Sequence, residues 1–194
     1  MTAAAVLLLV GTGITLVSLI VVHLLPTGLN PLRDPVSQYG ITRYRGWYWS
    51  AAAGAALAGV GGAVFFAPTS STIAIVTVVL LVMFAVARAL IGFFPMDAPE
   101  RAATRAGRLH NLLATAAFAS VTAAAFTGAG ALRDAGFADA SVWSTVCGAI
   151  MALGTVGLIL ATRAGLRAFF GLAERLIYVG FLAWFVLLAV LALS

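Results

Sequence analysis

Charged side chains are scarce in this sequence, and lysine is absent from it. Arginine supplies all 11 positive charges, six residues are acidic, and charged residues make up 9% of the 194 positions. A soluble domain carries roughly a quarter charged residues. The deficit excludes the soluble globular, disordered and fibrous classes of protein. The single cysteine, Cys147, lies inside an apolar run, which excludes a disulfide framework and a CxxC metal or redox site.

Motifs typical of soluble active sites are absent as well. The sequence contains no P-loop, no GxGxxG after a strand, no GxSxG nucleophile elbow and no HExxH zinc motif. Nucleic acid is not an expected partner, because anionic lipid is nearer to the arginines of residues 101–108. The motifs therefore assign no reaction to the chain.

Apolar residues occur in long runs. They make up 63% of the chain, and a bilayer core about 30 Å thick needs roughly 20 apolar residues per helix. Six runs have that length, at about 3–25, 47–67, 72–94, 109–131, 142–162 and 172–193. They predict one all-α domain over residues 1–194, an integral membrane bundle of six transmembrane helices joined by short loops. The first run lacks a basic n-region and is too long for a signal peptide.

The segments between the runs predict the orientation. Counting Arg88 with its nearest helix end, ten arginines belong to the odd-numbered loops and only Arg133 belongs to the other side. Short loops rich in arginine stay in the cytoplasm. We therefore expect a multi-pass plasma-membrane protein with cytoplasmic odd loops and both termini outside. Loop 1 is expected to contain a short interfacial helix, beginning after residues 30–31 or 34–35.

Rows of small residues predict close helix packing. Gly54, Ala58 and Gly62 recur every four positions in the second run, and Gly148 and Ala152 have the same spacing in the fifth. Small side chains let helix backbones approach one another in lipid. The rows either hold the bundle together or form the face of a homodimer.

The groups that could carry chemistry gather at one end of the expected bundle. They are His23, Asp34, Ser37, Arg88, Asp97, Glu100, His110, Glu174 and Arg175. No Asp, Glu, His or Lys lies in the middle of an apolar run, which counts against a proton pump because a relay through the membrane needs such groups. Haem needs ligands deeper in a bundle, and no zinc motif supports the two histidines. We therefore expect no metal site and no cofactor.

Four of the acids have a structural alternative. Asp34 precedes a proline at a position where helices begin, and Asp97 with Glu100 three residues later matches a capping box. Glu174 opens the sixth run, where the helix dipole favours an acid. Each carboxylate either serves a helix end or points into a shared cleft.

His110 and Arg88 are the residues that best separate function from architecture. At 100° per residue His110 shares a face with Gly107 and Ala114, opposite Arg105, so it is expected to point inward. It either satisfies a backbone carbonyl or works as a base or ligand. Arg88, about 10 Å inside its helix end, either snorkels to the interface or meets a carboxylate or an anionic ligand.

The second alternative for Arg88 makes a geometric prediction. We predict that Arg88 and His110 face one cavity at the cytoplasmic side, within one or two contacts of Asp97 or Glu174.

These residues give the leading functional hypothesis. We expect a polar cleft at the cytoplasmic face that binds a lipid-like amphiphile with an acyl or prenyl chain and an anionic head. The candidate catalytic residues are His110 and Asp97 for acid–base chemistry, Ser37 as a nucleophile and Glu174 as a further acid. The candidate ligand-binding residues are Arg88, Arg175, Asp34 and His23.

Two alternatives from other classes stay open. One is a small transporter or channel that uses the same cluster as its inner gate, and the other is a membrane partner subunit without chemistry. Membrane lipids are the expected partners of all three, a homodimer is a further alternative, and the sequence leaves open whether the protein is an enzyme.

Four motifs at these places resemble a known family. They are NPLRDPVSQYG after the first run, GFFPMD and GRLHNLLA around the fourth, and GLAERLIYVGFLAW at the start of the sixth. Over nearly its whole length the chain resembles the prokaryotic integral-membrane family catalogued as domain of unknown function 998. The matching residues are Pro35, Ser37, Gly40, Phe94, Pro95, Asp97, Leu109, His110, Gly171, Glu174 and Arg175. Some members carry a second histidine one turn after the first, where this chain has Ala114. The resemblance implies a prokaryotic membrane protein and supplies no function.

Overall fold

Six long helices make up most of the protein. The computed structural model describes residues 2–99, 101–163 and 167–194. The helices are α1 (Ala3–Leu24), α2 (Arg45–Phe66), α3 (Thr72–Leu90), α4 (Arg105–Asp134), α5 (Ala138–Arg163) and α6 (Phe170–Leu193). Each helix, α3 and α6 together with the short 3-10 helix beside it, is long and apolar enough to cross a membrane. The predicted all-α bundle with six spans is confirmed.

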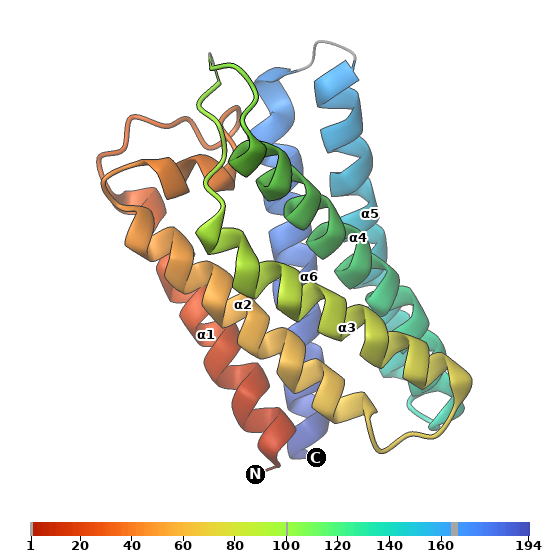
Figure 1. The fold of residues 1–194 in the computed structure, drawn as a ribbon. Helices are drawn as coiled ribbons and strands as arrows, with labels where there is room; N and C mark the ends of the chain where they lie inside the picture. The colour runs from red at the N-terminus through yellow and green to blue at the C-terminus, as the bar shows by residue number, and fades with distance from the viewer. Residues whose placement is uncertain (1, 100, 164–166) are drawn as a thin grey trace.

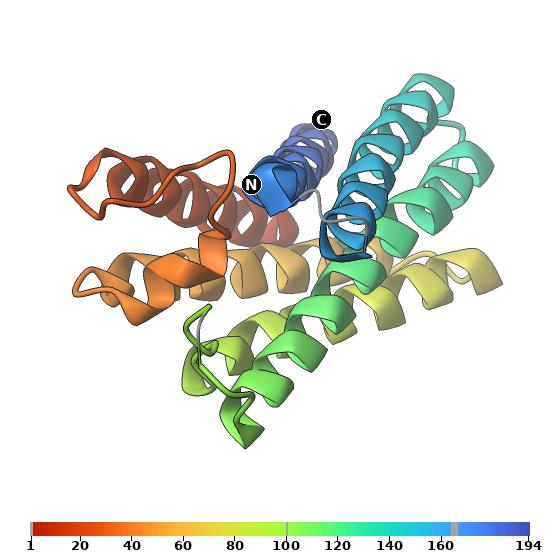
Figure 2. The same cartoon turned by 90° about the horizontal axis from the view of Figure 1, so that it is seen from above.

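The helices form a closed ring. Each one packs against the next in the sequence, and α6 returns to pack against α1 (Figure 1). Seen from above, α6 lies between α1 and α5 (Figure 2). The two termini lie at the same end, where the Thr2 hydroxyl donates to the carbonyl oxygen of Ala192 at 3.1 Å.

Aromatic side chains fill the centre of the ring. Phe84 of α3 packs against Phe181 and Phe185 of α6, with ring centroids 5.6 and 5.7 Å apart. On the same helix Trp184 is fully buried. Its indole N–H donates to the Ser144 hydroxyl of α5 at 2.8 Å, so the polar atom of this large side chain is satisfied inside the bundle.

The row of small residues on α2 packs inside the chain. A Cβ added at Gly11 of α1 would lie 2.4 Å from the backbone nitrogen of Ala58. A Cβ added at Gly54 would lie 2.7 Å from the carbonyl oxygen of Gly11. Only glycine permits such an approach of two backbones. Gly54 and Ala58 therefore hold α2 against α1, and a Cβ added at Gly62 would meet Leu81 of α3 at 3.2 Å, so the row packs within the bundle.

Loop 1 contains a short 3-10 helix, as expected. It is η1 (Val36–Ile41), and it follows Pro35, which makes no side-chain cap. Asp34 is therefore not the helix cap that the sequence suggested. Its carboxylate accepts a hydrogen bond from the backbone N–H of Asn30 at 2.7 Å and closes the preceding turn.

Helix α4 begins four residues before its apolar run because a threonine caps it. Thr104 has an extended backbone, and its hydroxyl accepts a hydrogen bond from the backbone N–H of Gly107 at 3.1 Å. This is the usual geometry of an N-cap. The first turn therefore includes Arg105 and Arg108, which hydrophobicity alone leaves out.

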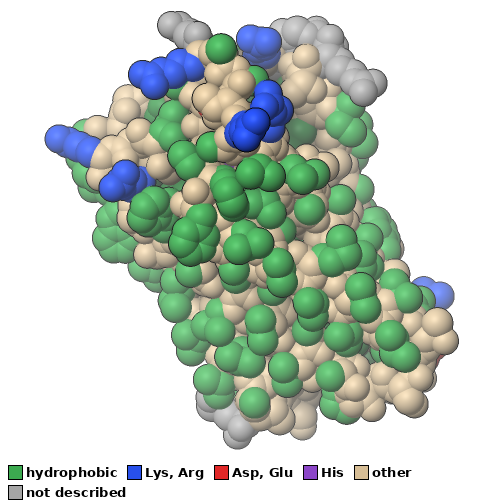
Figure 3. All heavy atoms as spheres, in the orientation of Figure 1, with side chains coloured by type: hydrophobic (Ala, Val, Ile, Leu, Met, Phe, Trp, Pro, Cys, Tyr) green, Lys and Arg blue, Asp and Glu red, His purple; other side chains and the backbone are tan. Residues whose placement is uncertain are grey.

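Arginine side chains gather at one end of the bundle (Figure 3). This end, called the basic end below, comprises residues 25–44, 91–99 and 101–104 and the 3-10 helix Arg167–Phe169. Among the described arginines Arg133, at the end of α4, lies at the opposite end. The flank between the ends is covered with apolar side chains, as a membrane-spanning surface requires.

Candidate functional site

A cavity of about 500 Å³ lies between α4, α5 and α6 near the basic end. Its polar lining residues are Ser37, His110, Asn111, Thr115, Thr155, Thr162 and Glu174. Its apolar lining residues are Ala114, Phe118, Ala119, Leu158, Ile159 and Phe170. Several lining residues of α4 and α5, such as Thr115 and Ile159, are exposed on the outside of the bundle, so the cavity opens sideways between these helices. Three of the predicted catalytic residues line it.

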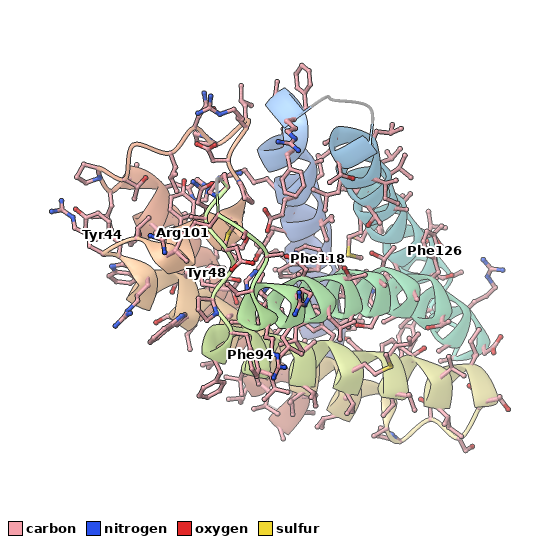
Figure 4. All side chains as sticks on the ribbon, turned by 45° about the horizontal axis from the view of Figure 1, so that its top comes forward. Tyr44, Tyr48, Phe94, Arg101, Phe118 and Phe126 are labelled. Carbon is pink, nitrogen blue, oxygen red and sulfur yellow. The ribbon has the colours of Figure 1, made fainter. Side chains whose placement is uncertain are left out.

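His110 lies on the inward face of α4, as predicted, and is 3% exposed. Its Nδ1 lies 2.8 Å from the carbonyl oxygen of Phe94, which is labelled in Figure 4. A carbonyl oxygen only accepts, so Nδ1 carries the proton and, in the neutral ring, Nε2 is left with a lone pair. Nε2 is buried and has no partner among the described residues. The histidine therefore has one satisfied nitrogen and one free to take a proton.

Glu174 is 4% exposed at the start of α6. Its Oε2 accepts a hydrogen bond from the backbone N–H of Val36 at 2.7 Å. This hydrogen bond holds η1 against the N-terminal end of α6. Ser37, the second residue of η1, lines the cavity. Ser37, His110 and Glu174 thus meet at one cavity, although no hydrogen bond joins the three side chains to one another.

A second cluster, the loop-1 clamp, consists of His23, Asp34, Gly171 and Arg175. The Arg175 Nε donates to His23 Nε2 at 2.9 Å, and its Nη1 donates to the carbonyl oxygens of Asp34 at 3.0 Å and Gly171 at 2.9 Å. Nδ1 of His23 lies 2.7 Å from the carbonyl oxygen of Leu19. Because Nδ1 donates there and Nε2 accepts, His23 is neutral and both of its nitrogens are satisfied.

The clamp joins loop 1 to the first turn of α6. The backbone N–H group of Gly171 donates to the carbonyl oxygen of Arg33 at 3.2 Å, and that of Leu172 donates to the carbonyl oxygen of Leu32 at 2.9 Å. Helix N-termini leave such donors without intrahelical partners. The predicted ligand-binding residues His23, Asp34 and Arg175 are therefore brought together, but they bond to one another and to the backbone, and none of them lines the cavity.

Asp97 serves the start of α4 in a different way from the predicted capping box. Its carboxylate accepts hydrogen bonds from the Thr104 hydroxyl at 2.7 Å and the Thr104 backbone N–H at 2.9 Å. These two bonds, with the nearby charge of Arg108, hold the pKa of Asp97 below its ordinary value. Asp97 thus positions the cap residue rather than capping the helix, and it does not line the cavity. Glu100, the other member of the predicted box, lies outside the described residues.

Arg88 is 1% exposed and does not snorkel to the interface. Its guanidinium lies 5.5 Å from the ring centre of Tyr178. Nε and Nη2 have no hydrogen-bond partner, and no carboxylate lies within 4.0 Å, within the part of the chain that the structure describes. Arg88 lines a separate cavity of about 200 Å³ between α2 and α3. The prediction that it shares one cavity with His110 is wrong, because α3 turns Arg88 toward α2 and Tyr178.

Sequence reasoning missed several lining residues. Asn111 and Thr162 were not singled out, nor was Phe170. A signal was present in α5, where Thr155, Leu158 and Thr162 are spaced three and four apart and so share a face. No group of three metal-ligating side chains lies close enough to hold an ion among residues 2–99, 101–163 and 167–194.

Six apolar helices in a ring, with arginines gathered at one end, define a multi-pass helical membrane protein. A family model described as "Protein of unknown function (DUF998)" matches residues 9–191. The chain belongs to this family, which confirms the resemblance of its four motifs. No curated protein and no solved structure matches the chain.

Proposed function

We propose that the cavity between α4, α5 and α6 binds a lipid-like amphiphile and presents its head to His110 and Glu174. The observation that carries this proposal is the buried lone pair of His110 Nε2, which has no partner among the described residues. Buried polar groups are almost always hydrogen-bonded, so an unpartnered nitrogen on a residue that lines a cavity requires a partner, which a bound ligand or a water would supply.

The lining changes character along the cavity. His110, Asn111 and Glu174 line its end near loop 1, and Phe118, Ala119 and Leu158, with Thr155 among them, line it farther along. From His110 to Ala119 the lining rises by roughly 13 Å along α4. A volume of about 500 Å³ is within the range of small-molecule sites. Since the cavity opens sideways, an acyl or prenyl chain can enter from the membrane.

The head of the ligand is best met by an uncharged group. Arg88 and Arg175, which the sequence suggested as holders of an anionic head, do not line this cavity. The acid Glu174 disfavours an anion at the same place. A hydroxyl or ester head, which offers both donors and acceptors, suits the lining better, and the anionic head is given up for this cavity.

Acid–base chemistry follows from the tautomer of His110. The bond to Phe94 orients the ring, so that Nε2 can accept a proton from a hydroxyl of the ligand or from water. A positioned base of this kind accelerates a reaction by about 10²–10⁴-fold. Ser37, which lines the same cavity, is the candidate nucleophile.

The helices are in close contact beyond the cavity, which favours a binding cleft over a transport path through the bundle. Beyond the cavity Ser144 of α5 donates to the carbonyl oxygen of Ala125 of α4 at 2.7 Å, and Trp184 of α6 donates to Ser144. Phe126 also packs over Gly148, where an added Cβ would lie 3.1 Å from its ring. These contacts join α4, α5 and α6 where a transport path would have to continue.

The test uses a monoacylglycerol that carries a photoreactive diazirine in its chain. Crosslinks are expected on α4 and α5, between residues 114–119 and 155–159. Ala114→Trp fills the cavity and should abolish them. Leu153→Trp is the matched control, because Leu153 is 67% exposed on α5 and does not line the cavity. Equal labelling of the two variants would contradict the proposal.

The proposed acid–base chemistry of His110 is tested separately with the same monoacylglycerol. If the protein hydrolyses the bound ester, His110→Gln should slow turnover by about 10²–10⁴-fold while crosslinking is retained. Unchanged turnover in His110→Gln would contradict the role of His110 as a base, and the proposal that the cavity binds the amphiphile would stand.

A further inference from the structure

Two cavities follow one another along the α2–α3 side of the bundle, apart from the cavity described above. The first, about 200 Å³ at the basic end, is lined by Trp49, Ala52, Ala53, Arg88, Ala89, Gly92 and Phe93. The second, about 340 Å³, is lined by Val60, Ala63, Val64, Ala67, Val78, Val82, Ala85 and Val86. Figure 1 shows α2 and α3 side by side over this length.

The two cavities lie on one continuous stripe of each helix. On α2 the lining positions recur at intervals of three, four and seven from Trp49 to Ala67, and on α3 they do so from Val78 to Gly92. Positions with this spacing share one helix face. The small cleft at the basic end and the valine-lined groove therefore face the same way, and one elongated molecule can occupy both.

The lining of the cleft carries a positive charge and no acid, and the buried Glu174 of α6 acts on Arg88 only from beyond 4.0 Å. Arg88 is buried, and its Nε and Nη2 have no partner among the residues that the structure describes. The lining of the cleft contains no carboxylate. A second cation, Arg45, lies 5.1 Å from the ring centre of Trp49, which lines the cleft. Buried charge is expensive unless it is paired, so the site favours an anion.

The walls have room for a phosphate group. Ala52, Ala53, Ala89 and Gly92 contribute little side-chain volume between the aromatic rings of Trp49 and Phe93. Arginine presents several donors in a planar fork that matches phosphate oxygens. The groove beyond is lined entirely by alanine and valine, which suits an acyl chain and offers nothing to a free phosphate ion.

We propose that this α2–α3 face binds one anionic phospholipid. Its phosphate lies against Arg88 with Arg45 at the edge of the cleft, and one acyl chain lies in the valine-lined groove. The site is separate from the cavity of His110 and does not depend on the function proposed there.

Native mass spectrometry of the purified protein in dodecylmaltoside, titrated with phosphatidylglycerol, tests this proposal. We expect one phosphatidylglycerol to bind at least tenfold more tightly than phosphatidylcholine, and excess inorganic phosphate not to displace it. Arg88→Gln should weaken binding at least tenfold. Arg133→Gln, which removes a charge at the opposite end, should not change it.

The position of the acyl chain is tested with a second pair of variants. Val86→Trp fills the groove from an exposed position and should weaken binding, whereas Val79→Trp, exposed on α3 but off the groove, should not. Equal affinity of these two variants, no preference for phosphatidylglycerol, or displacement by inorganic phosphate would each overturn the proposal. If Arg88→Gln fails to fold, the Val86 and Val79 pair, together with Arg45→Gln, decides the question.

Discussion

The two histidines of this protein share one contact and differ in the other. Nδ1 of His23 lies 2.7 Å from the carbonyl oxygen of Leu19, and Nδ1 of His110 lies 2.8 Å from that of Phe94. Both rings therefore present an Nε2 lone pair. In the loop-1 clamp that lone pair accepts a hydrogen bond from Arg175, whereas at the cavity it has no partner among the described residues.

The difference separates a structural cluster from a candidate site. In the clamp the hydrogen bonds of His23 and Arg175 join α1, loop 1 and α6. At the cavity a buried acceptor without a partner costs about 1–3 kcal/mol. Residue type alone therefore does not distinguish the two histidines, whereas the state of the second nitrogen does.

Breaking the clamp at its tightest contact should have the largest effect. A Cβ at Gly171 would lie 2.5 Å from the carbonyl oxygens of Asp34 and Pro31 and 2.8 Å from Nη1 of Arg175. Overpacking costs about 1–3 kcal/mol, and each lost hydrogen bond to a charged group adds about 1.5–3 kcal/mol. Gly171→Ala should therefore lower the free energy of unfolding in detergent by roughly 3 kcal/mol or more.

Gly13→Ala is the control for this change, because no heavy atom lies within 4 Å of a Cβ added there. It should be neutral or slightly stabilising. Equal losses in the two variants would show that loop 1 is not held at Gly171.

Truncating each histidine tests the comparison directly. His23→Ala leaves the charged Nε of Arg175 without its partner, whereas the carbonyl of Leu19 keeps its helical bond to the backbone N–H of residue 23. We expect a loss of about 1–3 kcal/mol in unfolding free energy. His110→Ala leaves only the carbonyl of Phe94 unpaired and removes the partnerless Nε2, so its loss should be smaller. Thermal unfolding of both variants in dodecylmaltoside measures which loss is larger. A larger loss for His110→Ala would contradict the distinction between a structural His23 and a His110 with an unpartnered nitrogen.

Glu174 lines the cavity and also holds loop 1 through the backbone N–H of Val36. A conservative change can separate these two roles. Glu174→Gln keeps an oxygen that accepts from the Val36 N–H, so loop 1 should stay docked and the unfolding free energy should change by less than about 1 kcal/mol. The acid at the cavity is lost, and any turnover that depends on it should fall. A large loss of stability would mean that the charge itself holds loop 1.

The smallest expected effect is the pH dependence from Asp97. Its folded pKa lies below the ordinary value, so its contribution to stability is complete above about pH 4 and is lost as the pH falls through the folded pKa. Unfolding midpoints of the wild type should therefore drop in acid more than those of Asp97→Asn. Parallel curves for the two proteins would remove Asp97 as a stabilising partner of Thr104.

Local pattern predicted a good part of this molecule. The apolar runs located all six helices, and the 100° spacing placed His110 inward and Arg105 outward. Boundaries were less accurate where a polar cap decides them, as Thr104 does for α4. The choice between snorkelling and burial of Arg88 could not be made, because the position along the helix is the same in both.

The partners of the polar groups lie far apart in the chain. His23 and Arg175 are 152 positions apart, and Val36 and Glu174 are 138 apart. No local spacing encodes such pairs, and the sequence therefore grouped His23, Asp34 and Arg175 with the cavity residues that they do not join.

The sequence by itself determined that this is a bundle of six membrane-length helices with most of its arginines at one end. Length, apolarity and charge are properties of each segment alone, and a bilayer selects for them directly. Only the tertiary structure decided which histidine is satisfied and which faces a cavity, and that Arg88 belongs to another face. Hydrogen-bond partners and cavities arise where segments distant in the chain meet, and the ring closed by α6 sets those meetings.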